Sequence, residues 1–120
     1  MTEQLAFDHL GGEQFCYLTT TGRSSGEPRT IEIWFGTNGR RLYLLAGGGE
    51  KAHWVRNLRA RREASVRIAA QEFAVRAAVV AEPEEDALAR RLLLEKYAPG
   101  YGGDLSGWGR TALPVALEPV

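Results

Sequence analysis

The chain has 120 residues, of which 44% are hydrophobic, which is enough for one compact core and too few for two ordinary domains. Its 15 basic side chains balance its 15 acidic ones, so the protein lacks the net charge that would attract nucleic acid or an anionic membrane. A single cysteine, Cys16, excludes an internal disulfide and a cysteine-built zinc site, and it fits a reducing compartment. We therefore expect one domain over residues 1–120 and a cytoplasmic location.

The N-terminal lead segment, residues 1–13, contains Glu3 and Asp8 and has no apolar run. It therefore matches neither a signal peptide nor a membrane span. Residues 15–20, which are rich in aromatic and β-branched side chains, predict a first strand, and the turn formers at 21–28 end it.

A second strand is predicted over residues 29–35, where apolar and other side chains alternate. The Asn38-Gly39 pair indicates a tight hairpin turn, and residues 42–46 supply the returning strand. We therefore expect the second and third strands to be antiparallel neighbours.

Apolar residues at helical spacing after the glycine run 47–49 predict a helix over about residues 50–61. Residues 64–70 and 72–81 are expected to pair as a hairpin.

Pro83 and the acidic residues 84–86 indicate the start of a second helix, with these carboxylates acting as a solvated helix cap. Residues 113–117 predict the last strand. About six short strands and two helices favour a small α+β, mainly β, antiparallel barrel or sandwich over a parallel Rossmann sheet.

Two segments are candidates for anion binding. The connection at residues 19–30 gathers threonine hydroxyls, the guanidiniums of Arg23 and Arg29, and free backbone amides, a set that suits phosphate oxygens. The glycine run 47–49 leads through Lys51 into a predicted helix, whose N-terminus also favours an anion. The alternatives are a polar hairpin loop and a flexible strand-to-helix connection, respectively.

Other chemistries find little support. His9 and His53 have no carboxylate or cysteine at ligand spacing, so we expect no metal site, and no Gly-x-Ser-x-Gly motif is present. Tyr97, Tyr101 and Trp108 lie near a glycine-rich segment that could form a lid stacking on an aromatic ligand; ordinary packing of the C-terminal strand is the alternative.

The run from Leu18 to Arg29 contains Thr-Thr-Thr-Gly-Arg and Ser-Gly-x-Pro-Arg, and it resembles the signature of the deazaflavin-dependent nitroreductases. The similarity continues through Glu50-Lys51 and Trp54 to the segment from Tyr97 to Tyr101, and it covers roughly residues 15–119.

This resemblance implies a six-stranded antiparallel split β-barrel with two or three helices, related to the pyridoxamine-phosphate oxidase fold. It also implies that coenzyme F-420 binds and passes hydride to quinones, nitro compounds or activated alkenes. Arg29 and Lys51 would hold the phosphate and oligoglutamate tail, and the backbone from Ile31 to Ile33 would line the ring. The candidate coenzyme-binding residues are Arg23, Ser24, Ser25, Arg29, Ile31, Glu32, Ile33, Gly48, Gly49, Lys51 and Trp54.

Tyr97 and Tyr101 are the candidate catalytic residues, as hydrogen-bond or proton donors to the small-molecule acceptor. Ser24 stands where the family usually has a lysine that neutralises the coenzyme tail, and the chain lacks the longer lead segment of membrane-associated members. FMN could replace the deazaflavin, because the same groups would hold its phosphate. A non-catalytic coenzyme-binding module and a structural dimerisation domain are further alternatives, and a homodimer is expected.

Overall fold

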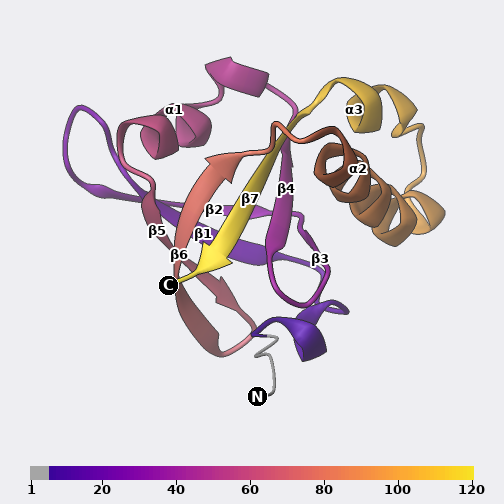
Figure 1. Ribbon diagram of the computed structural model, residues 1–120, viewed down its shortest axis with the longest axis horizontal. Helices are drawn as coiled ribbons and strands as arrows, with labels where there is room; N and C mark the ends of the chain where they lie inside the picture. The colour runs from indigo at the N-terminus through magenta and orange to yellow at the C-terminus, as the bar shows by residue number, and fades with distance from the viewer. Residues whose placement is uncertain (1–5) are drawn as a thin grey trace.

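The computed structural model describes residues 6–120 as a curled antiparallel sheet with helices at one end and on one outer face (Figure 1). Its strands are β1 (Cys16–Thr21), β2 (Pro28–Ile33), β3 (Gly36–Thr37), β4 (Leu42–Ala46), β5 (Glu63–Ile68), β6 (Gln71–Val79) and β7 (Leu113–Pro119). The helices are α1 (His53–Ala60), α2 (Pro83–Tyr97) and α3 (Ser106–Thr111), with short 3-10 turns η1 (Asp8–Leu10), η2 (Gly49–Lys51) and η3 (Ala98–Gly100).

The seven strands lie in the order β2-β1-β5-β6-β7-β4-β3, so β2 and β3 form the two edges. Only Trp34 and Phe35 separate these two strands in the chain, and the sheet must therefore curl until its edges approach each other. The α+β split-barrel prediction is confirmed. The sheet has seven strands where six were expected. The additional strand is β3, whose two residues are too few to show an alternating pattern in the sequence.

The predicted pairing of the second and third strands is wrong. β2 pairs with β1, whereas β4 pairs along its whole length with β7, from Leu42↔Leu117 to Ala46↔Leu113. The chain bends at Phe35, whose N–H donates to the Tyr97 hydroxyl over 3.0 Å and whose C=O accepts from Lys96 Nζ over 2.9 Å. Side chains of α2 thus bind backbone groups that a straight strand would present to a neighbour.

The predicted turn at Asn38-Gly39 is confirmed, but it joins β4 to the short β3. Gly39 has a φ of 94°, which favours glycine, and Asn38 Oδ1 accepts hydrogen bonds from the backbone N–H groups of Arg40 and Arg41. The β5–β6 hairpin is confirmed as well, with Glu63 opposite Arg76. The helix predicted from about residue 50 is divided into η2 and α1.

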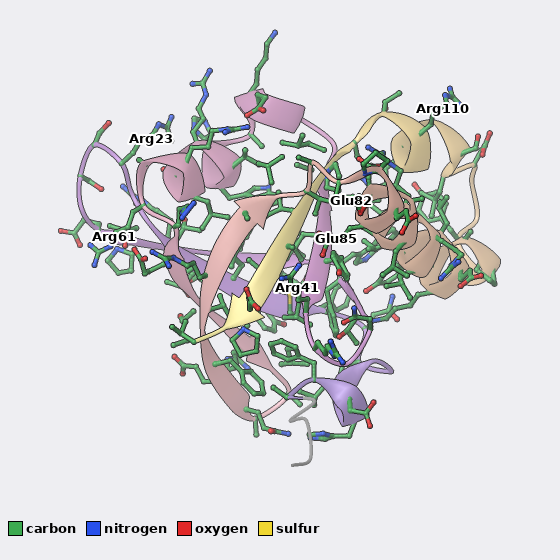
Figure 2. The ribbon with its side chains drawn as sticks, in the orientation of Figure 1. Arg23, Arg41, Arg61, Glu82, Glu85 and Arg110 are labelled. Carbon is green, nitrogen blue, oxygen red and sulfur yellow. The ribbon has the colours of Figure 1, made fainter. Side chains whose placement is uncertain are left out.

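The start of α2 at Pro83 is confirmed, but the carboxylates around it accept hydrogen bonds from protein groups as well as from solvent. Glu82 caps the helix by accepting from the N–H groups of Glu84 and Glu85. Glu85 also accepts from Arg41 Nη1 and from the Tyr43 hydroxyl, each over 2.7 Å, and these bonds lower the pKa of its carboxyl group (Figure 2). The expectation that residues 84–86 form only a solvated cap is therefore wrong for Glu85.

The apolar residues form two clusters on opposite sides of the sheet. The first fills the barrel, and α1 closes one end of it through Val55 and Leu58. The second lies where α2 and α3 cover the outer face of β4 and β7, around Tyr43 and Leu93.

The lead segment contributes to the first cluster from residue 6 onward, since Phe7 is fully buried. Its ring meets that of Phe73 edge to face, with centroids 4.9 Å apart. Residues 1–5 of the segment lie outside the described residues.

We expect Tyr97→Phe to destabilise the fold by about 1–3 kcal/mol, because the buried N–H of Phe35 would lose its hydrogen-bond acceptor. Urea unfolding measures the change. Tyr101→Phe is the matched control, because Tyr101 is 47% exposed, and its expected effect is within about 0.5 kcal/mol. Equal stabilities of the two variants would contradict the role given to the Tyr97 hydroxyl.

Candidate functional site

A cavity of about 420 Å³ lies between α1 and the loop that joins β1 to β2. Its lining residues are Thr20, Gly22, Arg23, Ser24, Ser25, Arg29, Ile31, His53, Trp54 and Asn57. The structure therefore brings together a large part of the predicted coenzyme-binding set, from two segments about 30 residues apart in the sequence.

The Gly-Arg-Ser-Ser-Gly sequence folds this loop back on itself. The N–H of Gly22 donates to Glu27 O, and the N–H of Gly26 donates to Gly22 O, each over 2.8 Å. A Cβ at Gly22 would lie 2.7 Å from Ser25 Oγ, so the close approach requires glycine there. Ser25 Oγ accepts from Arg29 Nη2 over 3.4 Å and thereby orients the guanidinium at the cavity.

A buried polar network attaches the loop to α1. Asn57 is 4% exposed, and its Oδ1 accepts from both the backbone N–H and the Nη1 of Arg23, at 3.2 and 2.8 Å. Asn57 Nδ2 donates to the Thr20 hydroxyl over 3.1 Å. Arg23 Nη2 lies 3.2 Å from Nδ1 of His53, which must accept because a guanidinium only donates. Arg23 thus has fixed protein partners as well as a place at the cavity.

The electrostatics of the cavity favour an anion. Arg23 and Arg29 contribute two guanidiniums, and no carboxylate occurs among the lining residues. The first turn of α1 lies at the cavity with His53 and Trp54, and its N-cap residue, Ala52, provides no side-chain hydrogen bond. The helix N-terminus therefore adds backbone donors and the positive end of its dipole.

Gly48, Gly49 and Lys51 do not line this cavity. They lie in and beside η2, where Gly49 has a φ of 59° and Lys51 is exposed. The neighbouring Glu50 accepts from Arg59 Nε over 2.6 Å, and this bond lowers the pKa of its carboxyl group.

Glu32 and Ile33 line a second cavity of about 590 Å³ with Phe15, Trp34, Leu45, Tyr101, Asp104, Leu105 and Trp108. Alternate residues of a strand share a face, so Ile31 at the first cavity and Ile33 at the second lie roughly 7 Å apart along β2. The strand thus runs past both cavities.

Trp34 is the centre of an aromatic cluster at this second cavity. Its ring stacks on Tyr97 at 4.2 Å between centroids, and it meets Tyr101 and Trp108 edge to face at 5.9 and 5.7 Å. In the sequence, the two tyrosines group with Trp108, whereas Trp34 is one residue of an alternating strand and has no predicted role.

The two candidate catalytic tyrosines differ in accessibility. Tyr97 is 4% exposed, lines neither cavity, and has a hydroxyl within 2.9 Å of Gln14 O; burial raises its pKa to about 12. Tyr101 is exposed and lines the second cavity. The geometry favours a structural role for Tyr97, and proton donation by either tyrosine stays a prediction.

Thr20, His53 and Asn57 also line the cavity but were not among the candidate coenzyme-binding residues, although Thr20 lies in the anion-binding segment predicted at residues 19–30. His53 and Asn57 are four residues apart and share one face of α1 with Trp54, which was in the predicted set. That spacing is the signal that could have identified them.

Two classes of feature are absent from residues 6–120. No group of three or more His, Cys, Asp or Glu side chains there could hold a metal ion. No helix in this part of the chain has the length and apolar character needed to cross a membrane.

We expect Asn57→Ala to release the loop from α1, because Arg23 and Thr20 would lose their buried partner. Hydrogen exchange at the Arg23 amide should accelerate, and urea unfolding should show a loss of about 1–3 kcal/mol. Ser24→Ala is the control, since Ser24 is exposed at the same cavity. Unchanged exchange at Arg23 in Asn57→Ala would refute the anchoring role.

The model of the family described as F420H(2)-dependent quinone reductase matches residues 5–119. A solved conserved hypothetical protein from Mycobacterium tuberculosis superposes with a TM-score of 0.74 at 20% identity, over 99% of this chain and 81% of its own. A protein described as F420 Reductase gives 0.68 at 18% identity, over 100% and 96%. An F420-H2 Dependent Reductase (FDR-A) gives 0.67 at 23%, over 87% and 92%.

At these identities the solved structures show the shared fold, while the family model extends over nearly the whole chain. The match includes both the arginine-containing loop and the aromatic cluster. The chain therefore belongs to the F420H(2)-dependent quinone reductase family.

Proposed function

We propose that this protein is an oxidoreductase that binds coenzyme F-420 and transfers hydride from its reduced form to a small organic acceptor. Quinones, nitro compounds and activated alkenes are the acceptor classes. The observation that carries the proposal is the pair of cavities along β2, one lined by arginines and the other by aromatic rings. Family membership supports the choice of coenzyme.

The residues present fit the anionic part of this coenzyme. Arg29, oriented by Ser25, and the N-terminus of α1 would hold its phosphate, and Arg23 adds a second guanidinium. Lys51, exposed just before α1, is available to the oligoglutamate tail. Ser24 adds no charge, so tail binding depends on these basic residues.

The ring would lie along β2. An edge strand has backbone N–H and C=O groups on its free side, and these can bind a polar heterocycle. When bound, the reduced coenzyme supplies the hydride, and the protein's role is to align ring and acceptor while excluding water. The acceptor would occupy the second cavity, over Trp34 and beside Tyr101.

FMN is the alternative cofactor, since Arg29 and Ser25 would hold its phosphate equally well. A module that binds the coenzyme without turnover is a further alternative. The aromatic cavity favours an enzyme, because it offers an acceptor a site beside the proposed ring position. The expected homodimer and the cytoplasmic location stay predictions.

We expect Arg29→Gln to weaken binding of coenzyme F-420 by about tenfold or more, because it removes a charge-assisted hydrogen bond to phosphate. Fluorescence titration with F-420, and in parallel with FMN, measures the change. Arg67→Gln is the control, since Arg67 lies over the Tyr17 ring at 4.4 Å and lines neither cavity. Equal affinities of the two variants would contradict the phosphate site, and tighter binding of FMN would contradict the coenzyme assignment.

We expect Tyr101→Phe to lower turnover by about 100-fold, in the range for loss of a proton donor, while the affinity for coenzyme is retained. Tyr97→Phe should keep its turnover per folded molecule, because its hydroxyl is enclosed by Gln14 and Phe35. Single-turnover oxidation of the bound reduced coenzyme by a model quinone measures both. Full activity in Tyr101→Phe would exclude it as the proton donor.

A further inference from the structure

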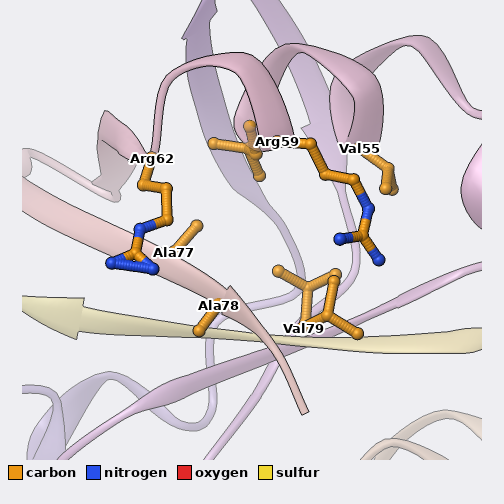
Figure 3. Close-up of a pocket in the computed structure, with 8 residues that line it drawn as sticks. Val55, Arg59, Arg62, Ala77, Ala78 and Val79 are labelled. Atoms are coloured by element: carbon orange, nitrogen blue, oxygen red, sulfur yellow. The ribbon is translucent and has the colours of Figure 1, made fainter. Parts of the chain in front are cut away.

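A third cavity lies on the opposite side of α1 from the arginine-lined first cavity, the proposed coenzyme cavity. Figure 3 shows the residues that line this third cavity. Its volume is about 370 Å³, and its lining residues are Val55, Leu58, Arg59, Arg62, Ala77, Ala78, Val79 and Val115. His53 and Asn57 belong to one side of the helix, and Val55 and Leu58 belong to the other. The proposed coenzyme function makes no use of this second side.

The cavity combines an apolar floor with a basic rim. Val55, Leu58 and Val115 are each at most 5% exposed. Figure 3 shows the side chain of Arg59 extending from α1, and that of Arg62 from the loop after α1, toward the strand that carries Ala77, Ala78 and Val79. An apolar floor with few polar groups at its edge is the usual composition of a small-molecule site.

Arg62 is held in place by its backbone but not by its side chain. Its C=O accepts from the N–H of Ala77 over 2.9 Å, which ties the connection between α1 and β5 to β6. Within residues 6–120 its guanidinium has no ion pair or hydrogen bond. This guanidinium is therefore available to an external acceptor.

The charge at the rim matches a monoanion. Arg59 is already paired with Glu50, so two guanidiniums and one carboxylate leave a net charge of one positive unit. A planar carboxylate fits the paired N–H groups of a guanidinium, whereas a dianionic phosphate would be only half neutralised here. The apolar floor requires that this carboxylate carry a hydrocarbon body.

We propose that this cavity is a binding site for a small monocarboxylate with an aliphatic or aromatic body. The carboxylate binds Arg62, and the hydrocarbon body lies against Val55, Leu58 and Val79. This site is separate from the coenzyme cavity and does not depend on coenzyme binding.

Titration of the full chain with hexanoate, followed by the amide resonances in nitrogen-15 NMR spectra, tests the site. We expect saturable shifts centred on Val79 and Val115, with weaker binding of acetate, which lacks the hydrocarbon body, and of hexanol, which lacks the charge. Shifts centred on Ser25 instead would place the ligand in the coenzyme cavity and overturn the proposal. The absence of saturable shifts up to 50-fold molar excess over ~1 mM protein would also overturn it.

Three variants of equal charge change identify the binding group. Arg62→Gln should weaken hexanoate binding about tenfold, the loss expected for a charge-assisted hydrogen bond. Arg61→Gln removes a neighbouring exposed arginine that does not line the cavity, and Arg29→Gln removes one of the two arginines that line the coenzyme cavity. Both should bind hexanoate within twofold of the unchanged protein. Equal weakening by Arg61→Gln would reduce the effect to general electrostatic attraction and contradict the site.

Discussion

The hydrogen bonds between the Tyr97 hydroxyl and Phe35 hold the bend at which the chain passes from one edge of the sheet to the other. A strand can leave a sheet inside a protein only if its backbone N–H and C=O groups find other partners. Tyr97 and Lys96, at the end of α2, supply those partners at Phe35. The Lys96 side chain is half-buried there, and this burial lowers its pKa to about 8. The bend sends one chain segment from one edge of the sheet to the other, and the barrel follows from it.

The site depends on that bend. Since β2 remains an edge strand, its free side runs past both the arginine-lined and the aromatic-lined cavity. The bend also supports the aromatic cavity, because Trp34, which precedes Phe35 and lines that cavity, stacks on the ring of Tyr97. Tyr97 therefore positions the proposed acceptor site from within the core, while Tyr101 is the tyrosine that an acceptor could touch.

Helix α1 contributes both to the candidate site and to the hydrophobic core. One side of it anchors the β1–β2 loop through Asn57, and the other contributes Val55 and Leu58 to the core. A polar network that is fully satisfied inside a protein fixes geometry as well as adding stability. Arg23 thus stands at the cavity in a fixed position, which suits recognition of a phosphate more than a mobile loop would.

The sequence by itself determined the local features, because each depends on neighbouring residues. These are the Asn38-Gly39 turn, the β5–β6 hairpin, the proline start of α2 and the glycine-dependent loop that carries Arg23 and leads to Arg29 in β2. The resemblance of that loop also identified the family that the whole chain matches.

Only the tertiary structure decided the pairing of β4 with β7, the burial of Tyr97, and the contact of His53 and Asn57 with the loop. Tyr97 and Phe35 are 62 residues apart, and Arg23 and Asn57 are 34 apart. No local pattern encodes contacts over such separations, because they arise when the sheet curls and its helices pack against it. Two tyrosines with similar sequence surroundings therefore have different environments, one enclosed by backbone carbonyls and the other open to a cavity.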